Sequence, residues 1–149
     1  MRSSAHFAAR LLSVSMALLA VSAVMRAAPG RSKSVWSGVY TVEQAKAGEK
    51  VYTAHCATCH GDDMGGIERA PGLVGGTFRE SWHGVTLRKL FERIEGMPPD
   101  EPKTLTAKEC ADVLAFLLSA SEMPAGSTPL PADRTLLGEI TFERAKPAP

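Results

Sequence analysis

Apolar residues recur at the spacing of an α-helix in three stretches of this chain. The first stretch begins at Thr41 and runs to the cysteine pair, the second covers about 86–94, and the third begins at Thr106. A Gln or Glu follows each of these two threonines by three residues, which is the capping-box signature of a helix start. The residues that share the apolar faces are Ala45, Gly48 and Tyr52 in the first helix, Leu87, Leu90, Phe91 and Ile94 in the second, and Cys110, Val113, Leu114 and Leu117 in the third.

Glycine and proline mark close approaches and turns around these helices. Gly48 costs its helix about 1 kcal/mol relative to alanine, so we expect another helix to approach closely there. Residues 61–76 include six glycines and predict a loop, which is long for a small domain unless it has a function. Met97-Pro98-Pro99 predicts a rigid, extended turn, because a residue before proline is disfavoured in helical conformation.

The pattern divides the chain into four segments. Residues 1–28 contain three arginines, no acid and an apolar stretch of signal-peptide length, and they predict a signal peptide or an N-terminal anchor. Residues 29–40 form a lead-in that we expect to lie extended over the surface. Residues 41–121 form the helical domain, and the Pro-rich residues 122–149 form a tail that we expect to wrap around it, with a short helix at 134–137.

The net charge and the N-terminal segment favour an exported protein that does not bind nucleic acid. The chain has seventeen basic and sixteen acidic residues. Removal of residues 1–28 takes away three of the basic residues and no acid, which leaves fourteen against sixteen, a net charge of about −2. No basic patch suggests nucleic acid, and no lysine-rich stripe suggests a strongly acidic partner. We expect a periplasmic protein, associated with the membrane only if the N-terminal segment is retained.

The run Cys56-Ala57-Thr58-Cys59-His60 is the main chemical signal of the chain. Two thiols separated by two residues add across the two vinyl groups of a haem, and the histidine that follows ligates the iron. The spacing places both sulfurs on one edge of the porphyrin. It therefore predicts one covalent haem c, attached through Cys56 and Cys59 and ligated by His60.

Three other interpretations of the motif are weaker. A zinc site needs four Cys or His ligands, usually in two pairs, and the remaining Cys110, His55 and His83 form no second pair. A thioredoxin-like site needs a βαβ context, whereas the surrounding sequence predicts helices and loops. A disulfide between Cys56 and Cys59 is the third. Cys110 itself lies on an apolar helix face, where a thiol behaves as a small hydrophobe, so we expect a buried structural thiol.

The second axial ligand of the iron must come from a separate part of the chain. Met97 is the favoured candidate, because it lies 37 residues past His60 and two prolines fix its backbone. A methionine ligand raises the reduction potential relative to His/His ligation. It also fills the sixth position, which favours electron transfer over catalysis. The other residues compared are Met64 and His55, which lie too close to the motif, and Met123 and His83, which stay open.

With these features the chain resembles a class I monohaem cytochrome c over about residues 35–130. The resemblance implies an all-α fold, a cytochrome c-like domain of three main helices packed around a covalently bound haem. It is carried by the haem motif with Gly61, by Gly48 and Tyr52 in the helix before it, by Ala70-Pro71-Gly72-Leu73, by Met97-Pro98-Pro99, and by Phe116 in the last helix, which with Gly48 would mark the crossing of the first and last helices.

The resemblance also implies roles around the haem. The carbonyl of Pro71 would accept the proton on the far nitrogen of His60 and so fix its tautomer. Leu73 and Trp82 would line the haem pocket. The indole of Trp82 would either donate to a propionate or serve as a core aromatic residue.

A narrower resemblance concerns function. Residues 34–41, 78–84 and 115–119 look like small cytochromes encoded with, or fused to, quinoprotein dehydrogenases. This implies an electron-transfer protein, not an enzyme, that accepts electrons from a dehydrogenase, of the PQQ type, and passes them toward a terminal oxidase. The alternatives are a cytochrome subunit anchored in a quinoprotein dehydrogenase complex, and a haem peroxidase or catalytic subunit, which would need an open sixth position.

Overall fold

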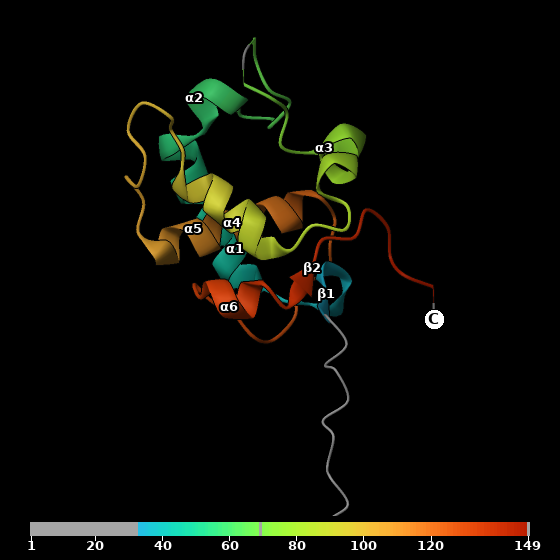
Figure 1. Ribbon diagram of the computed structural model, residues 1–149. Coiled ribbons are helices and arrows are strands. Elements are labelled where there is room, and N and C mark those ends of the chain that lie inside the picture. The colour runs from blue at the N-terminus through green and yellow to red at the C-terminus, as the bar shows by residue number, and fades with distance from the viewer. Residues whose placement is uncertain (1–32, 69, 149) are drawn as a thin grey trace, which may run out of the picture. The chain divides into compact units, whose positions relative to one another are not determined.

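The computed structural model describes residues 33–68 and 70–148, so the predicted signal peptide or anchor lies outside the described residues. This part of the chain is mostly helical, as predicted (Figure 1). Its elements in chain order are β1 (Lys33–Ser34), the 3₁₀ helix η1 (Val35–Ser37), α1 (Val42–His55), α2 (Ala57–His60), α3 (Gly75–Trp82), α4 (Leu87–Glu95), α5 (Ala107–Ala120), α6 (Arg134–Leu137) and β2 (Ile140–Thr141).

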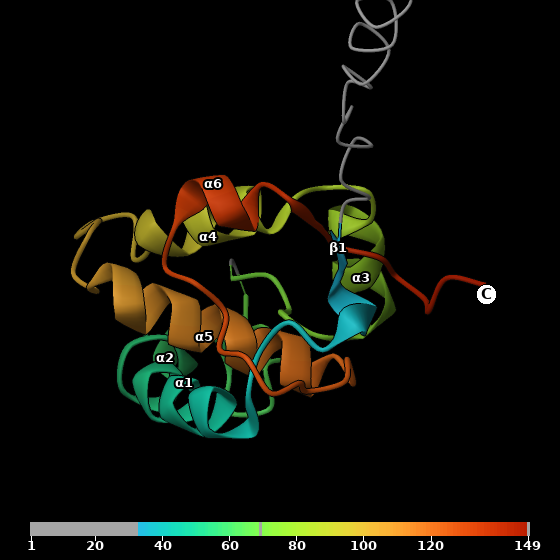
Figure 2. The same cartoon turned by 90° about the horizontal axis from the view of Figure 1, so that it is seen from below.

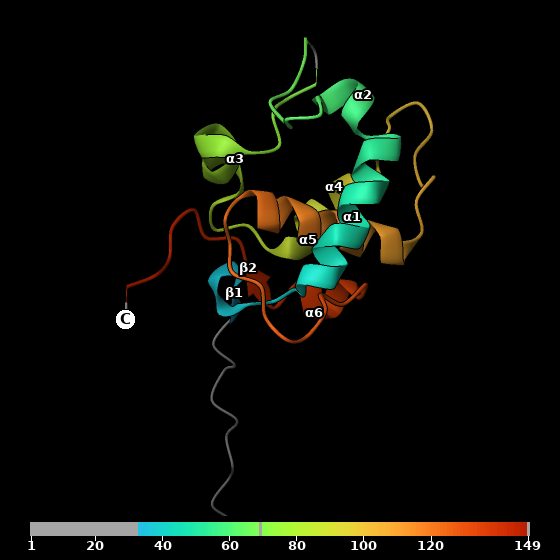
Figure 3. The same ribbon diagram turned by 180° about the vertical axis from the view of Figure 1, so that it is seen from behind.

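The first and last long helices, α1 and α5, cross in close contact (Figure 3). Gly48 lies at the crossing, where a Cβ atom added to it would come within 1.9 Å of the carbonyl oxygen of Asp112. One turn further along each helix, the rings of Tyr52 and Phe116 pack with their centroids 5.4 Å apart. The expected close approach at Gly48 is confirmed, because only a residue without Cβ allows the two backbones to touch.

The two predicted capping boxes have different outcomes. At the start of α5, the Thr106 hydroxyl accepts from the backbone N–H of Glu109, and the Glu109 carboxylate accepts from the backbone N–H of Thr106 at 2.8 Å. At the start of α1, the Thr41 hydroxyl accepts from the N–H of Gln44 at 3.2 Å. The Gln44 side chain, however, turns to the tail, where it donates to the carbonyl of Leu130 at 2.9 Å and accepts from its N–H at 2.6 Å. The first box was therefore only half correct.

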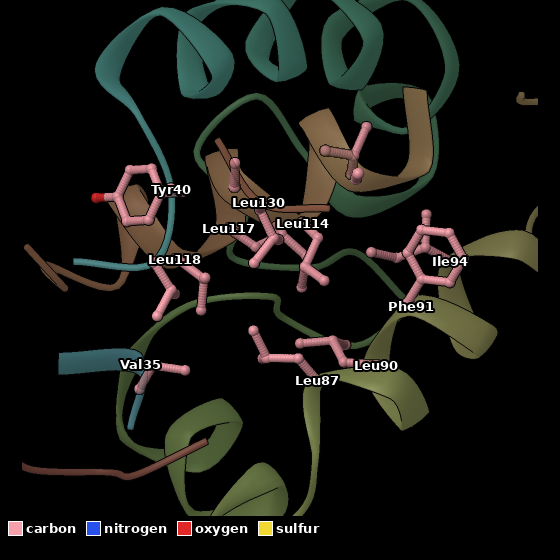
Figure 4. Packing of buried hydrophobic residues seen from close by; sticks show 14 of the residues in the cluster. Val35, Tyr40, Leu87, Leu90, Phe91, Ile94, Leu114, Leu117, Leu118 and Leu130 are labelled. Atoms are coloured by element: carbon pink, nitrogen blue, oxygen red, sulfur yellow. The ribbon is translucent and has the colours of Figure 1, made fainter. Parts of the chain in front are cut away.

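Helix α4 lies against α5 with its apolar face inward. The four residues predicted for this face are at most 8% exposed. In Figure 4 the side chains of α4 face those of α5 across the core. The facing sets are Leu87, Leu90, Phe91 and Ile94 on α4, and Leu114, Leu117 and Leu118 on α5.

One expectation about the fold was wrong, and one helix was not predicted. The loop expected at 61–76 extends to Val74, and its last two residues begin the unpredicted helix α3. A tertiary contact stabilises this helix, because Phe78 is buried and packs edge to face on Phe142 of the tail, with ring centroids 5.9 Å apart. The described part of the lead-in is not spread over the surface, since Val35 is fully buried and Tyr40 is 2% exposed. Strand β1 in this segment pairs in parallel with β2 of the tail, which covers it.

The tail wraps around the helices, and the predicted short helix at 134–137 is present as α6. Its course is fixed by backbone hydrogen bonds, with the Gly84 N–H donating to the carbonyl of Phe142 and the Phe142 N–H donating to the carbonyl of Val85. The buried apolar residues of the tail include Leu130, Leu137, Ile140 and Phe142. Within the described part of the chain, no helix is long and apolar enough to cross a membrane.

Candidate haem site

A cavity of about 980 Å³ lies between the end of α1, the loop that leads from α2 to α3, helices α3, α4 and α5, and the Met97 turn. In Figure 1 this loop runs from α2 to α3 along the top of the view, and α4 and α5 lie below it. The volume is at the upper end of the range of about 300–1,000 Å³ that ligand pockets occupy. The domain therefore has room for a large ligand among its helices.

The haem motif borders this cavity. Helix α1 ends at His55 with Cys56 as its C-cap, and α2 carries Cys59 and His60 into the lining. The Tyr52 hydroxyl donates to the carbonyl of Gly61 at 2.7 Å and so fixes the residue that follows the motif. No disulfide joins any of the cysteines among the described residues, so the disulfide interpretation of the motif gains no support.

His60 is oriented by the loop. Its Nδ1 lies 2.8 Å from the carbonyl oxygen of Pro71, the contact that the resemblance implied. Because a carbonyl can only accept, the proton is on Nδ1, and Nε2 keeps its lone pair for a metal. The loop is closed by the Gly66 N–H, which donates to the carbonyl of His60, and by the Leu73 N–H, which donates to that of Met64.

Met97 lies in the same cavity as His60. It follows the end of α4, where its N–H donates to the carbonyl of Ile94 at 3.0 Å, and its half-buried side chain lines the cavity beside Pro98 and Pro99. The sequence-predicted residues His60 and Met97 are thus brought together.

The alternative ligands are placed differently. Met64 and Met123 are buried outside the cavity lining, 6% and 3% exposed. His83 also lies outside the lining, with its Nδ1 3.4 Å from the carboxylate of Glu143. Of the other candidates, His55 borders the cavity, in the last turn of α1 next to the motif.

Apolar side chains make up much of the remaining wall. Leu73 and Trp82 belong to it, as the resemblance implied, and Trp82 packs 6.3 Å from the ring of Phe78. Sequence reasoning missed part of the wall, because an apolar helical stripe has the same pattern whether it faces other side chains or a cavity. The residues assigned only to the core that also border the cavity are Tyr52, Leu90, Ile94, Val113 and Leu117.

Burial raises the pKa of two cysteines, Cys56 and Cys110. It raises the pKa of Cys56, with a further rise from the neighbouring Cys59. It raises the pKa of Cys110 to about 11, and this side chain is fully buried, as predicted. A zinc site finds no support, since the described residues contain no group of three His, Cys, Asp or Glu side chains suited to a metal ion.

These residues fit a covalently held haem. The thiols of Cys56 and Cys59 border the cavity that His60 also borders, and Met97 supplies a soft donor to the same cavity. The apolar wall suits a porphyrin, and the Pro71 contact leaves the free nitrogen of His60 as a ligand.

Comparison with known proteins agrees with this site. Residues 43–117, 75 of the 149 residues, match the family described as "Cytochrome C oxidase, cbb3-type, subunit III". The "Cbb3-type cytochrome c oxidase subunit CcoP" of Rubrivivax gelatinosus is 34% identical over 82 aligned positions, and the alignment covers 52% of this chain and 26% of that protein. The chain thus spans about a quarter of the length of this relative. No solved structure matches.

Neither match supports the narrower resemblance to cytochromes of quinoprotein dehydrogenases. The matched segment begins within α1 and ends within α5, so it includes the haem motif, the Pro71 loop and the Met97 turn. The chain therefore belongs to the cbb3-type cytochrome c oxidase subunit III family, with a class I c-type cytochrome domain as its described part.

Proposed function

We propose that this protein is a one-electron carrier that holds a single haem c through Cys56 and Cys59, with His60 and Met97 as the two axial ligands. The observation that carries the proposal is that the motif and Met97, from separate parts of the sequence, border one apolar cavity. The haem, when bound, supplies the one-electron chemistry, and the chain supplies ligation, burial and a docking face.

Each residue has a separate task in this proposal. The two cysteines tether the group to the end of α1, and Pro71 holds the His60 ring so that Nε2 is the donor. Met97 fills the position opposite His60 and so leaves no open site for a substrate. Leu90, Ile94 and the other apolar wall residues exclude water, which favours the less charged, reduced state of the iron.

The acceptor is proposed from the relative and the donor from the resemblance. The relative from Rubrivivax gelatinosus is, by its name, a subunit of a cbb3-type cytochrome c oxidase. We therefore propose a terminal oxidase as the acceptor. A periplasmic dehydrogenase of the PQQ type is the proposed donor, and the N-terminal segment 1–28 supports a periplasmic location. Since the net charge without this segment is near zero, we expect electron transfer to depend only weakly on salt.

A second candidate is a cytochrome subunit that stays anchored to its complex by an uncleaved N-terminus. The relative's name, which is that of an oxidase subunit, favours it. Cell fractionation separates the two: a carrier is released with the periplasmic contents, and an anchored subunit stays with the membranes.

The proposed function is tested by electron transfer from the reduced holo-protein to oxidase-containing membranes. We expect rapid re-oxidation in stopped-flow measurements, and no binding of carbon monoxide to the reduced haem at neutral pH. Met97→Ala is the matched variant, and it is expected to bind carbon monoxide. Carbon monoxide binding by the parent protein would indicate an open iron site and contradict the carrier role, and so would a failure to reduce the oxidase. A steep fall of the rate with salt would contradict the expected weak dependence of electron transfer on salt.

A further inference from the structure

The tail contacts the helix that carries Met97. It begins at residue 122 and thus lies outside the family-matched segment 43–117. Its helix α6 lies on α4 (Figure 2). Arg134 of α6 donates to both carboxylate oxygens of Glu95 on α4, with Nη2 2.8 Å from Oε1 and from Oε2 and with Nε 3.3 Å from Oε2.

Glu95 stands at the base of the Met97 turn. It is the last residue of α4, and its carbonyl oxygen accepts from the N–H of Lys103 at 3.0 Å. The N–H of Met97 donates to Ile94, the residue before Glu95. Both ends of the turn at 97–103 are thus attached to the last residues of α4, so a displacement of Glu95 moves the whole turn.

Arg134 is itself held firmly. Asp133 caps α6 by accepting from the N–H groups of Thr135 and Leu136 at 2.8 and 2.9 Å, and Leu137 is fully buried. The carboxylate of Glu95 is sheltered, with 20% of its side chain exposed against 58% for Arg134. A forked guanidinium–carboxylate contact fixes direction as well as distance, which a single charge does not.

We propose that Arg134 is a positioning residue for Met97, and that through Glu95 the tail keeps the Met97 turn closed over the haem. This inference rests on the proposed function, since it assumes Met97 as the axial ligand. An external ligand reaches the iron only when the turn opens, so its apparent dissociation constant equals the intrinsic one divided by the open fraction. Loss of the fork raises the open fraction and strengthens binding of the external ligand.

The test is imidazole binding to the oxidised, full-length holo-protein. Imidazole displaces the methionine sulfur, and the near-infrared sulfur-to-iron band reports the displacement. Arg134→Ala is expected to lower the apparent dissociation constant about two- to fivefold, the range that a surface ion pair of good geometry supports. Arg134→Lys, which keeps the charge but loses the fork, is expected to restore part of the parent value.

Arg144→Ala is the matched control. Arg144 is on the same tail and donates to Glu80 of α3 at 2.7 Å, away from the Met97 turn. We expect its imidazole affinity to equal that of the parent protein. The proposal is overturned if Arg134→Ala leaves the affinity unchanged, or if Arg144→Ala raises it as much, because the effect would then come from general loosening of the tail.

Two measurements on the parent protein distinguish failure of the proposed function from failure of the role of Arg134. A parent protein without covalent haem refutes the haem assignment, and a haem protein without the near-infrared band refutes the Met97 ligand. Both are seen before any variant is compared, and either one removes the present proposal as well. A parent protein with haem and band, combined with an unaltered Arg134→Ala variant, overturns the role of Arg134 alone.

Discussion

Replacement of Gly48 by alanine tests the contact on which the domain is built. A Cβ atom at this position would lie 1.9 Å from the carbonyl oxygen and 2.4 Å from the carbonyl carbon of Asp112, both backbone atoms that no rotamer change can move. Ordinary contact begins at 3.4 Å. Helices α1 and α5 must therefore separate by about 1.5 Å at their crossing, a gap large enough to forfeit much of the neighbouring dispersion energy.

The expected loss of stability follows from two opposing terms. Overpacking of a core typically costs about 1–3 kcal/mol, and a clash with rigid backbone belongs at the upper end. The alanine returns about 1 kcal/mol of helix propensity. We expect a net decrease of about 2 kcal/mol or more in the free energy of unfolding, measured by guanidinium denaturation of the holo-protein. The packing of Tyr52 on Phe116, one turn away, is expected to loosen as well.

Gly76→Ala is the matched control for this prediction. Gly76 also lies in a helix, α3, but a Cβ added to it meets no atom within 4 Å. The control is expected to equal the parent in stability or to exceed it by up to about 1 kcal/mol. If Gly48→Ala is as stable as this control, the backbones of α1 and α5 do not touch as described, and the reasoning is refuted.

Three further predictions concern the ligand, the third cysteine and a cap. Met97→Ala should abolish the near-infrared sulfur-to-iron band of the oxidised protein; its persistence would refute Met97 as the ligand. Cys110 is fully buried, and burial raises its pKa to about 11, so this thiol should resist alkylation at pH 8 until the protein unfolds. Rapid labelling of the native protein would contradict this. Cys110→Ala should keep redox activity while losing about 1 kcal/mol of stability. The hydrogen bonds from Thr106 lower the pKa of Glu109 below its ordinary value of about 4.3. The stability gained from this ionised cap is therefore complete above that value and lost as the pH falls through the lowered pKa. The stabilities of Glu109→Gln and the parent protein should therefore converge as the pH falls. A constant difference in stability down to pH 2 would disprove the role of the charge.

Local signals in the sequence predicted the elements that they determine alone. The apolar face of α4, the cap of α5 and the short helix α6 were all anticipated, because spacing and capping residues are sufficient to specify them. Contacts distant in sequence were not anticipated. Helix α3 depends on Phe78 meeting Phe142, and Gln44 leaves its expected capping partner for Leu130, 86 residues away. No periodicity within a short window carries that information.

The same distinction applies to the site. The spacing of the two cysteines and His60 predicted the haem motif, because a covalent chemistry demands it. The contact of His60 with Pro71 came from the resemblance. Nothing in the sequence indicated the ion pair between Arg134 and Glu95. An exposed arginine in a tail is an ordinary surface residue until the fold brings the two side chains together.

The intact mass of the exported protein, measured after denaturation and acid-acetone extraction, tests the central claim most directly. The account predicts a polypeptide heavier by the mass of one haem, with the haem stain retained on a denaturing gel. Cys56→Ser and Cys59→Ser together should return the mass to that of the bare chain, whereas Cys110→Ser should keep the added haem. A parent protein with the mass of the bare chain, and no stain on the polypeptide, would contradict the covalent haem and with it the proposed function.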